Sequence, residues 1–319
     1  MTMTMTMRGA MMGYLSRTGG VIAVTLAVAT AAVAVFLLSA TSVGAQVRMT
    51  VPSQSGPVAL RGATIHTVTN GVIENGTILF DNGVISAIGT DVQIPAGTRV
   101  VDVSGKHIYP GLIDAYSTVG ISEIGAVGVS SDVNELGDFN PNVRADVAVN
   151  AESRHIGTSR SAGVLVTLTT PDGGLISGMS SAMSLEGWDW EEMSMKSAAA
   201  LNVNWPNPNP GGRGRGGRGG RGGVQAPPPT YGEQVKQLKD FFAEARAYRD
   251  ATAAGEEVRT DSRYAAMIPA LDREIPVVVS ADGAAQINDA ITWAQEEGVR
   301  LVIRGGGDAV HVADRLVAN

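Results

Sequence analysis

The 319-residue sequence contains no cysteine and only four histidines. The lack of cysteine excludes a disulfide framework, a cysteine zinc site and a thiol nucleophile. The histidines are scattered rather than clustered, which restricts metal chemistry, and they are His66, His107, His155 and His311. Basic residues are scarcer than acidic ones, 24 against 31, which gives a formal net charge of −7. This acidic balance argues against a general nucleic-acid binder, and the length allows roughly two domains.

Acidic residues are absent from positions 1–45, which have the features of an export signal. Two arginines precede an unbroken run of small and apolar residues from Val21 to Leu38, and Val43 and Ala45 fit the small-residue rule for cleavage. We therefore predict a signal peptide over 1–45 and export to the bacterial periplasm or the medium, which suits a cysteine-free chain. The apolar run is longer than the usual ~7–15 residues, so an uncleaved membrane anchor is the alternative.

The exported part opens with short predicted strands between residues 57 and 108. Asn-Gly pairs at 70–71 and 82–83 separate alternating apolar segments. This pair is the strongest short hairpin signal, because the turn needs positive φ at both central residues. Turns at this frequency predict a small sandwich or partial barrel, and we assign residues 46–109 to part of a β-sandwich domain. His66 and His107 lie in this region, where a lone histidine on a strand is expected to be structural.

After Pro110 the pattern changes to apolar strands that alternate with helices. The run Ala162–Thr170 is continuous and β-branched, as expected for a parallel strand buried on both faces. Apolar spacings of three and four predict a helix from Tyr231 to Ala254. Two further strand–helix pairs follow over residues 274–318. This alternation predicts βα units, a parallel sheet and an α/β fold.

A segment rich in proline, glycine and arginine interrupts this order at 202–230. Glycine and proline at this density cannot pack a core, so we predict a flexible surface insertion between two elements. The alternative is an RNA-binding segment of the RGG type, whose arginines would be Arg213, Arg215, Arg218 and Arg221. The acidic, exported character of the chain favours the insertion.

Three segments of the chain resemble a known family. The sequence GKHIYPGLIDAYST over residues 105–118 is similar to G-K-x-h-x-P-G-h-I-D-x-H-x-H, the barrel entry of the amidohydrolase superfamily. Residues 162–178 are similar to the second-strand region of the imidazolonepropionase-like branch, and residues 275–306 to a later metal-bearing strand with its helix. The resemblance implies an N-terminal β-sandwich and a (β/α)8 TIM-type barrel. That barrel would occupy 110–319 and be incomplete at the C-terminus, because a whole one needs ~250 residues.

The resemblance also implies a metal-dependent hydrolase. Members of the family use one or two divalent ions, usually zinc, to hydrolyse C–N bonds in amides, cyclic amides and dipeptide-like substrates. Here the family's ligand positions are occupied by Tyr116, Thr118, Ser280 and Asp282. Neither a phenol nor a hydroxyl replaces imidazole as a neutral zinc ligand near pH 7. Zinc is therefore implied by the family but is not supported by these positions.

Two functions follow from the resemblance. The first is an exported enzyme that hydrolyses a C–N bond of a small amide-type substrate, with Asp114, Ser280 or Asp282 as candidates for a metal-free mechanism. The second is a catalytically degenerate binding protein, or a subunit that forms an oligomer with an active amidohydrolase. The replacement of several ligands at once favours the second, since loss of one already cripples a zinc site. We expect no nucleic-acid partner, and membrane contact only through an uncleaved signal.

Overall fold

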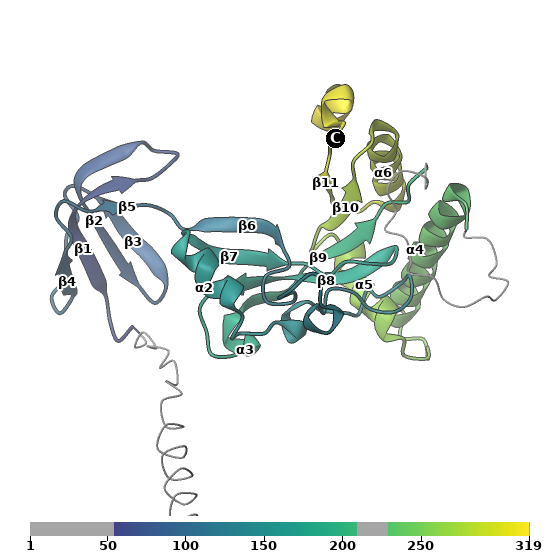
Figure 1. Ribbon diagram of the computed structural model, residues 1–319, viewed down its shortest axis with the longest axis horizontal. Helices are drawn as coiled ribbons and strands as arrows, with labels where there is room; N and C mark the ends of the chain where they lie inside the picture. Colours follow the sequence, from purple (N-terminus) through teal and green to yellow (C-terminus); the bar gives the residue numbers. More distant parts are fainter. Residues whose placement is uncertain (1–53, 209–228, 319) are drawn as a thin grey trace, which may run out of the picture. The chain divides into compact units, whose positions relative to one another are not determined.

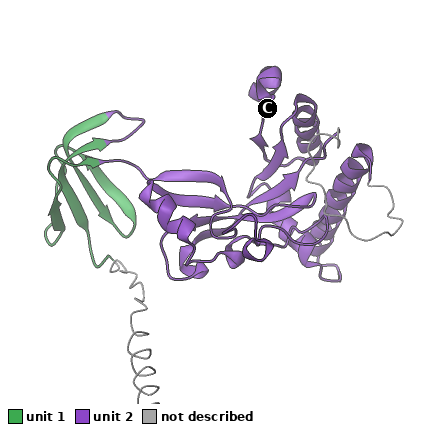
Figure 2. Cartoon of the chain, viewed as in Figure 1, with its two compact units in different colours: residues 1–65, 72–107 green, residues 66–71, 108–319 purple. Residues whose placement is uncertain are grey.

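The computed structural model describes residues 54–208 and 229–318. The predicted signal peptide at 1–45 and most of the predicted insertion at 202–230 lie outside these ranges. Within the described ranges, no helix combines the length and apolar character needed to cross a membrane. The chain divides into two compact units, shown in different colours in Figure 2.

Unit 1 consists of the described residues up to 65 together with 72–107. Its described part forms a five-stranded sheet in the order β3-β2-β1-β4, in which β5 also pairs with β1. The strands are β1 (Val58–His66), β2 (Val72–Asp81), β3 (Val84–Gly89), β4 (Arg99–Asp102) and β5 (His107–Ile108). The β2–β3 hairpin turns at Asn82 and Gly83, whose φ angles of 47° and 75° confirm the predicted turn.

The described residues of unit 1 form one sheet, so the assignment of residues 46–109 to part of a β-sandwich domain stays a prediction. One side of the sheet buries small and branched side chains such as Ala59, Ala63 and Ile65. On β3, by contrast, Val84 and Ile85 are more than half exposed, so no described layer covers them.

Unit 2 consists of residues 66–71 and 108–319 and contains, among its described residues, a six-stranded sheet in the order β11-β10-β9-β8-β7-β6 (Figure 1). Its strands are β6 (Leu112–Ser117), β7 (Val164–Thr169), β8 (Ile176–Ser184), β9 (Ser194–Asn204), β10 (Val277–Ala281) and β11 (Leu301–Gly305). Its α-helices are α2 (Arg154–Ser161), α3 (Trp190–Met193), α4 (Tyr231–Ala253), α5 (Ser262–Leu271), α6 (Ala284–Glu297) and α7 (Ala313–Val317). Short 3-10 turns are η1 (Gly128–Ser130), η2 (Asp146–Ala148) and η3 (Ala309–Val312).

The sheet of unit 2 is mixed, so the prediction of a parallel sheet was wrong in its middle. Strand β7 is parallel to β6 but antiparallel to β8, and β8 is antiparallel to β9. Strands β9, β10 and β11 are parallel. The reason lies in the length of the connections. A parallel crossover needs a dozen or more residues, whereas β7 and β8 are joined only by the short segment of residues 170–175. Strand β7 is also not buried on both faces, because Leu165 is half exposed.

The predicted insertion begins too early in the sequence. Strand β9 continues to Asn204, and its residues Asn202 and Val203 are buried and pair with β10. Trp205 is also buried, with its ring 5.6 Å from that of Trp293. The asparagines and the nearby prolines give residues 202–205 the composition of a loop. The pairing with β10 nevertheless holds residues 202–204 in the sheet, and aromatic packing holds Trp205 in the core.

The main core of unit 2 lies between β9, β10 and the helices α4, α5 and α6. Helix α4 begins at a capping box, in which Thr230 and Glu233 each bind the other's backbone N–H. Its buried face carries Leu238 and Phe242, and the Phe242 ring meets Trp293 of α6 edge-on at 5.0 Å. These contacts cover one face of the sheet with helices.

A buried carboxylate organises the loop before α2. Asp146 is fully buried and accepts hydrogen bonds from Arg144 Nε at 3.1 Å and from Val147 N at 3.0 Å. Burial by itself would raise the pKa of Asp146. The hydrogen bonds from Ser197 and Arg144, together with the Arg144 charge, outweigh burial and hold that pKa below its ordinary value of 3.8.

We expect Leu238→Ala to lower the free energy of unfolding by about 2–5 kcal/mol, because it opens a cavity in the core between α4 and the sheet. The matched control is Leu136→Ala, at a side chain that is 95% exposed, which should change stability by less than about 0.5 kcal/mol. Urea unfolding followed by tryptophan fluorescence measures both. Equal stability of the two variants would contradict this placement of the core.

We expect Asp146→Asn to cost about 1–3 kcal/mol at pH 7, because it removes a charged acceptor from a buried network. A carboxyl whose folded pKa is lowered stabilises the fold above its unfolded pKa, and this contribution is lost as pH falls through the folded value. The stability difference between wild type and variant should therefore shrink below pH 3.8. Urea unfolding between pH 3 and 7 tests this, with exposed Glu135→Gln as control; a difference independent of pH would refute it.

Candidate functional site

A row of polar side chains lies on the face of the unit 2 sheet opposite the core helices. Side chains alternate along a strand, so β10 directs Val277 and Val279 into the helix-covered core and Ser280 to the other face. In the register of the sheet, Ser280 pairs with Asn204 on β9 and with Arg304 on β11. Asn204, Ser280 and Arg304, here called the polar row, thus sit side by side at the carboxyl ends of three parallel strands. In α/β sheets, ligands bind at this end of the strands.

The side chain of Arg304 connects the two ends of the sheet. Its guanidinium carbon lies 4.1 Å from the centre of the Tyr116 ring, a cation–π contact. Tyr116 belongs to β6 and Arg304 to β11, which are the first and last strands of the sheet order. A flat sheet would hold its outer strands far apart, so this contact requires a strongly curled sheet.

Asn204 is held in place from several directions. Its amide nitrogen donates to the Gly174 carbonyl at 3.0 Å, and to Ser177 Oγ and Asp172 Oδ1 at 3.3 Å. Its amide oxygen accepts from Arg304 at 3.5 Å. The polar row therefore has a fixed acceptor at one end and the cation–π contact beyond its other end.

A second polar layer lies beneath the row. Asn202, two residues before Asn204, donates to Ser180 Oγ at 2.7 Å, and Ser180 shares a hydrogen bond of 2.9 Å with Thr170. All three of these side chains are buried. This connected layer satisfies its own hydrogen bonds, so it supports the row rather than offering groups to a ligand.

Several groups in and around the row have hydrogen-bonding or ion-pairing capacity that no described residue uses. Arg304 has no carboxylate within 4.0 Å among the described residues. The hydroxyls of Tyr116, Thr118 and Ser280 likewise make no hydrogen bond to any described residue. These groups are available to bind a ligand.

The structure brings some of the sequence candidates together. Tyr116 and Ser280 both adjoin Arg304, through the ring contact and through the strand register. Asp114 precedes Tyr116 on β6, is exposed, and accepts the Tyr116 N–H at 3.2 Å. Thr118 follows β6, and its carbonyl accepts two backbone N–H groups.

Asp282 lies against the end of β11. The backbone of Gly305 has a φ of 91°, and a Cβ built there would collide with the Asp282 carboxylate. Any residue other than glycine would thus be strained at 305 and would displace Asp282. A metal-ligating side chain has no space at this point of the strand.

The residues present do not fit the metal site that the family implies. Among the described residues, no group of three or more histidine, cysteine, aspartate or glutamate side chains could hold an ion. At the position of the first family histidine, the Tyr116 ring is covered by the Arg304 guanidinium. A fixed positive charge at this point would also repel a divalent cation.

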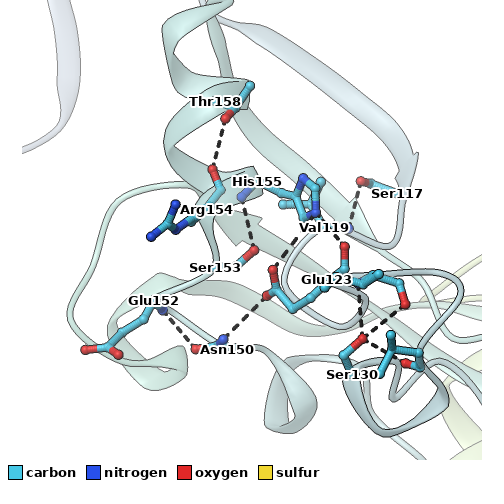
Figure 3. A network of polar contacts seen from close by, with 12 residues as sticks. Ser117, Val119, Glu123, Ser130, Asn150, Glu152, Ser153, Arg154, His155 and Thr158 are labelled. Atoms are coloured by element: carbon cyan, nitrogen blue, oxygen red, sulfur yellow. Dashed lines mark hydrogen bonds and ion pairs between the residues drawn. The ribbon is translucent and has the colours of Figure 1, made fainter.

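His155 belongs to a polar network at the start of α2. His155, in α2, has its Nε2 atom 2.8 Å from the Glu123 carbonyl oxygen and 4.0 Å from the Glu123 carboxylate (Figure 3). Asn150 donates to the same carboxylate at 3.4 Å. This network joins α2 to a loop. His66 stacks on the Tyr109 ring at 4.2 Å, so it too has a packing role.

Sequence reasoning missed Arg304 and Asn204. Arg304 interrupts the apolar run VRLVIRGGG. A charged residue inside a predicted buried strand is unusual, and this signal could have identified Arg304 as a candidate. Asn204 was assigned to the insertion, so its place at a strand end was hidden by composition.

Comparisons with known proteins agree with this architecture. No protein-family model matches the chain. A segment is 39% identical over 66 residues to the adenine deaminase of Shewanella halifaxensis (strain HAW-EB4), which covers 21% of the chain and 11% of that enzyme. A segment is also 39% identical over 54 residues to the imidazolonepropionase of Geobacillus kaustophilus (strain HTA426), and this match covers 15% of the chain and 13% of that enzyme.

The solved structure of an amidohydrolase from Thermotoga maritima MSB8 extends the likeness to most of the molecule. It matches with a TM-score of 0.70 and 26% identity, over 81% of this chain and 67% of that one. The chain belongs to the amidohydrolase superfamily. The likeness to imidazolonepropionase agrees with the predicted branch of that superfamily. The matched segments span about an eighth or less of the two curated relatives.

We expect this amidohydrolase-superfamily chain to retain far less than one zinc per molecule after dialysis against zinc and then against buffer. The reason is that the row offers hydroxyls, an amide and a guanidinium, which are poor zinc ligands. Inductively coupled plasma mass spectrometry of the purified full-length protein measures the metal. Asp282→Asn and Asp114→Asn should show the same content as wild type. One zinc per chain that either substitution removes would overturn the account of the site.

Proposed function

We propose that this protein is an exported member of the amidohydrolase superfamily that binds small molecules with an amide-type C–N bond, without hydrolysing them through its own residues. The observation that carries the proposal is the polar row, where Arg304 and hydroxyl groups occupy the strand ends. The donor set can form hydrogen bonds and ion pairs to a ligand. It lacks the imidazole ligands that metal-assisted hydrolysis needs.

We propose a TIM-type barrel as the finer description of unit 2. The curled sheet, its core helices on one face and the row on the other support it, as does the likeness to the Thermotoga amidohydrolase. In such a barrel, ligands bind at the carboxyl ends of the strands. Export to the periplasm or medium rests on the signal-like sequence over 1–45.

Catalysis by residues at the strand ends lacks an activated group. A serine nucleophile needs a general base within hydrogen-bond reach, and Ser280 Oγ has no partner among the described residues. The Asp114 carboxylate is exposed and accepts a backbone N–H. Asp282 is exposed and packed against Gly305. None of the three forms a nucleophile–base pair with another.

Hydrolysis of C–N bonds is the second candidate function. It is favoured by the likeness to adenine deaminase, imidazolonepropionase and an amidohydrolase of solved structure. The route compatible with the row is an oligomer in which a partner with an intact His-x-His motif carries the metal. In that arrangement this chain contributes binding rather than chemistry.

The test uses the exported protein with N-acetyl amino acids, dipeptides and lactams. Calorimetry should show saturable binding of at least one class, and chromatography should show no product. Ser280→Phe, which fills the row, should abolish binding, whereas Thr260→Phe on an exposed loop should not. Turnover by the isolated chain that is lost in Asp114→Asn would contradict the proposal and favour a hydrolase.

A further inference from the structure

Arg304 has more binding capacity than its described contacts use. A guanidinium carries five N–H donors in a planar fork. Within the described chain these donors make one long hydrogen bond of 3.5 Å to Asn204, and no carboxylate lies within 4.0 Å of them. The side chain is half-buried, so it has given up part of its hydration without gaining an ion pair. Such a cation favours a negatively charged ligand.

The guanidinium is held in a defined orientation. The Tyr116 ring lies against its face at 4.1 Å, which leaves the edge of the fork for hydrogen bonds. Asn204, which contacts that edge, is itself fixed by its bonds to the Gly174 carbonyl and to Ser177. The Ser280 hydroxyl adjoins Arg304 in register and has no described partner. A charged fork and a neutral donor therefore lie together.

We propose that the polar row binds the carboxylate of a small-molecule ligand, with Arg304 as the charged donor, Ser280 as a second donor and Tyr116 as a positioning residue. Arg-to-carboxylate pairs are often bidentate and are stronger than neutral hydrogen bonds. The proposal rests on the proposed function for the remainder of the ligand, an amide-type C–N bond. Together they define the ligand class as N-acyl amino acids and related amides with a free carboxylate.

The surroundings of the row favour a singly charged anion. Asp172 contacts Asn204 at 3.3 Å, Asp114 lies on the same strand as Tyr116, and Asp282 follows β10 directly. These three carboxylates repel a phosphate dianion more strongly than a carboxylate, since the Coulomb energy scales with the charge. One arginine beside three aspartates thus suits a carboxylate better than a phosphate.

Calorimetry on the full exported protein separates the two parts of the ligand. The probes are N-acetyl-L-alanine, with amide and carboxylate; N-acetyl-L-alaninamide, without the carboxylate; propionate, without the amide; and inorganic phosphate. We expect N-acetyl-L-alanine to bind about 10- to 100-fold more tightly than the alaninamide, as one charged hydrogen-bonded contact provides.

The variants assign this preference to the row. Arg304→Gln should abolish the preference for the acid, and Arg304→Lys should restore part of it. Tyr116→Phe should keep it, whereas Tyr116→Ala should weaken it, because only the ring positions the guanidinium. Arg154→Gln makes the same charge change at an exposed site on α2 and should leave the preference intact. Unfolding in urea establishes that each variant is folded.

Each outcome bears on a distinct claim. Equal binding of the acid and the alaninamide, unaffected by Arg304→Gln, would overturn the carboxylate site but leave amide binding in place. Propionate binding that depends on Arg304, with no binding of the alaninamide, would support the carboxylate site and count against the proposed function. Phosphate binding tighter than N-acetyl-L-alanine, or no binding of any probe at millimolar concentration, would overturn the carboxylate site.

Discussion

The strong curl of the unit 2 sheet is the constraint on which the rest of this unit depends, and the contact between Arg304 and Tyr116 reveals it. The two residues lie on the outermost strands of the six-stranded order in the described sheet, and their side chains meet at 4.1 Å. The sheet must curl to bring them together, with α4, α5 and α6 packed on one face. The other face then collects the alternate, polar side chains of β9, β10 and β11 at the strand ends. Curvature, core and site are therefore consequences of one geometry, in which apolar positions face the helices and polar positions face inward.

The same contact explains how this chain departs from the chemistry of its superfamily. Positions that hold imidazoles in the family carry Tyr116 and Ser280. The guanidinium of Arg304 contacts the Tyr116 ring, and Arg304 pairs with Ser280 in the strand register. The positive charge at this point belongs to a guanidinium, and a guanidinium does not activate water as a metal ion does. The Asp282 carboxylate against Gly305 closes the space where another ligand would project. A fixed organic cation suits recognition of an anion, so binding follows more directly from this site than hydrolysis.

Much of the architecture could be predicted from local patterns, and the failures have physical causes. The helix expected from Tyr231 ends one residue earlier than predicted, and the Asn82-Gly83 turn forms as expected, because spacing and turn geometry are local properties. Strand β8, with the sequence ISGMSSAMS, has a single β-branched residue and no clean alternation, and its antiparallel pairing follows from a short connection rather than from propensity. The role of Arg304 could not be read from the sequence, because it depends on a ring that is distant in the sequence and is brought close only by the curled sheet.

The central claim is that the strand ends are organised around the Arg304 guanidinium and not around a metal ion. Its most direct test is an NMR titration of the arginine Nε–H resonances, with Arg304 assigned by its loss in Arg304→Lys. The account predicts that N-acetyl-L-alanine shifts the Arg304 resonance and that equimolar zinc leaves it unchanged. A zinc-induced shift of this resonance that saturates at one ion per chain, with no response to N-acetyl-L-alanine, would contradict it.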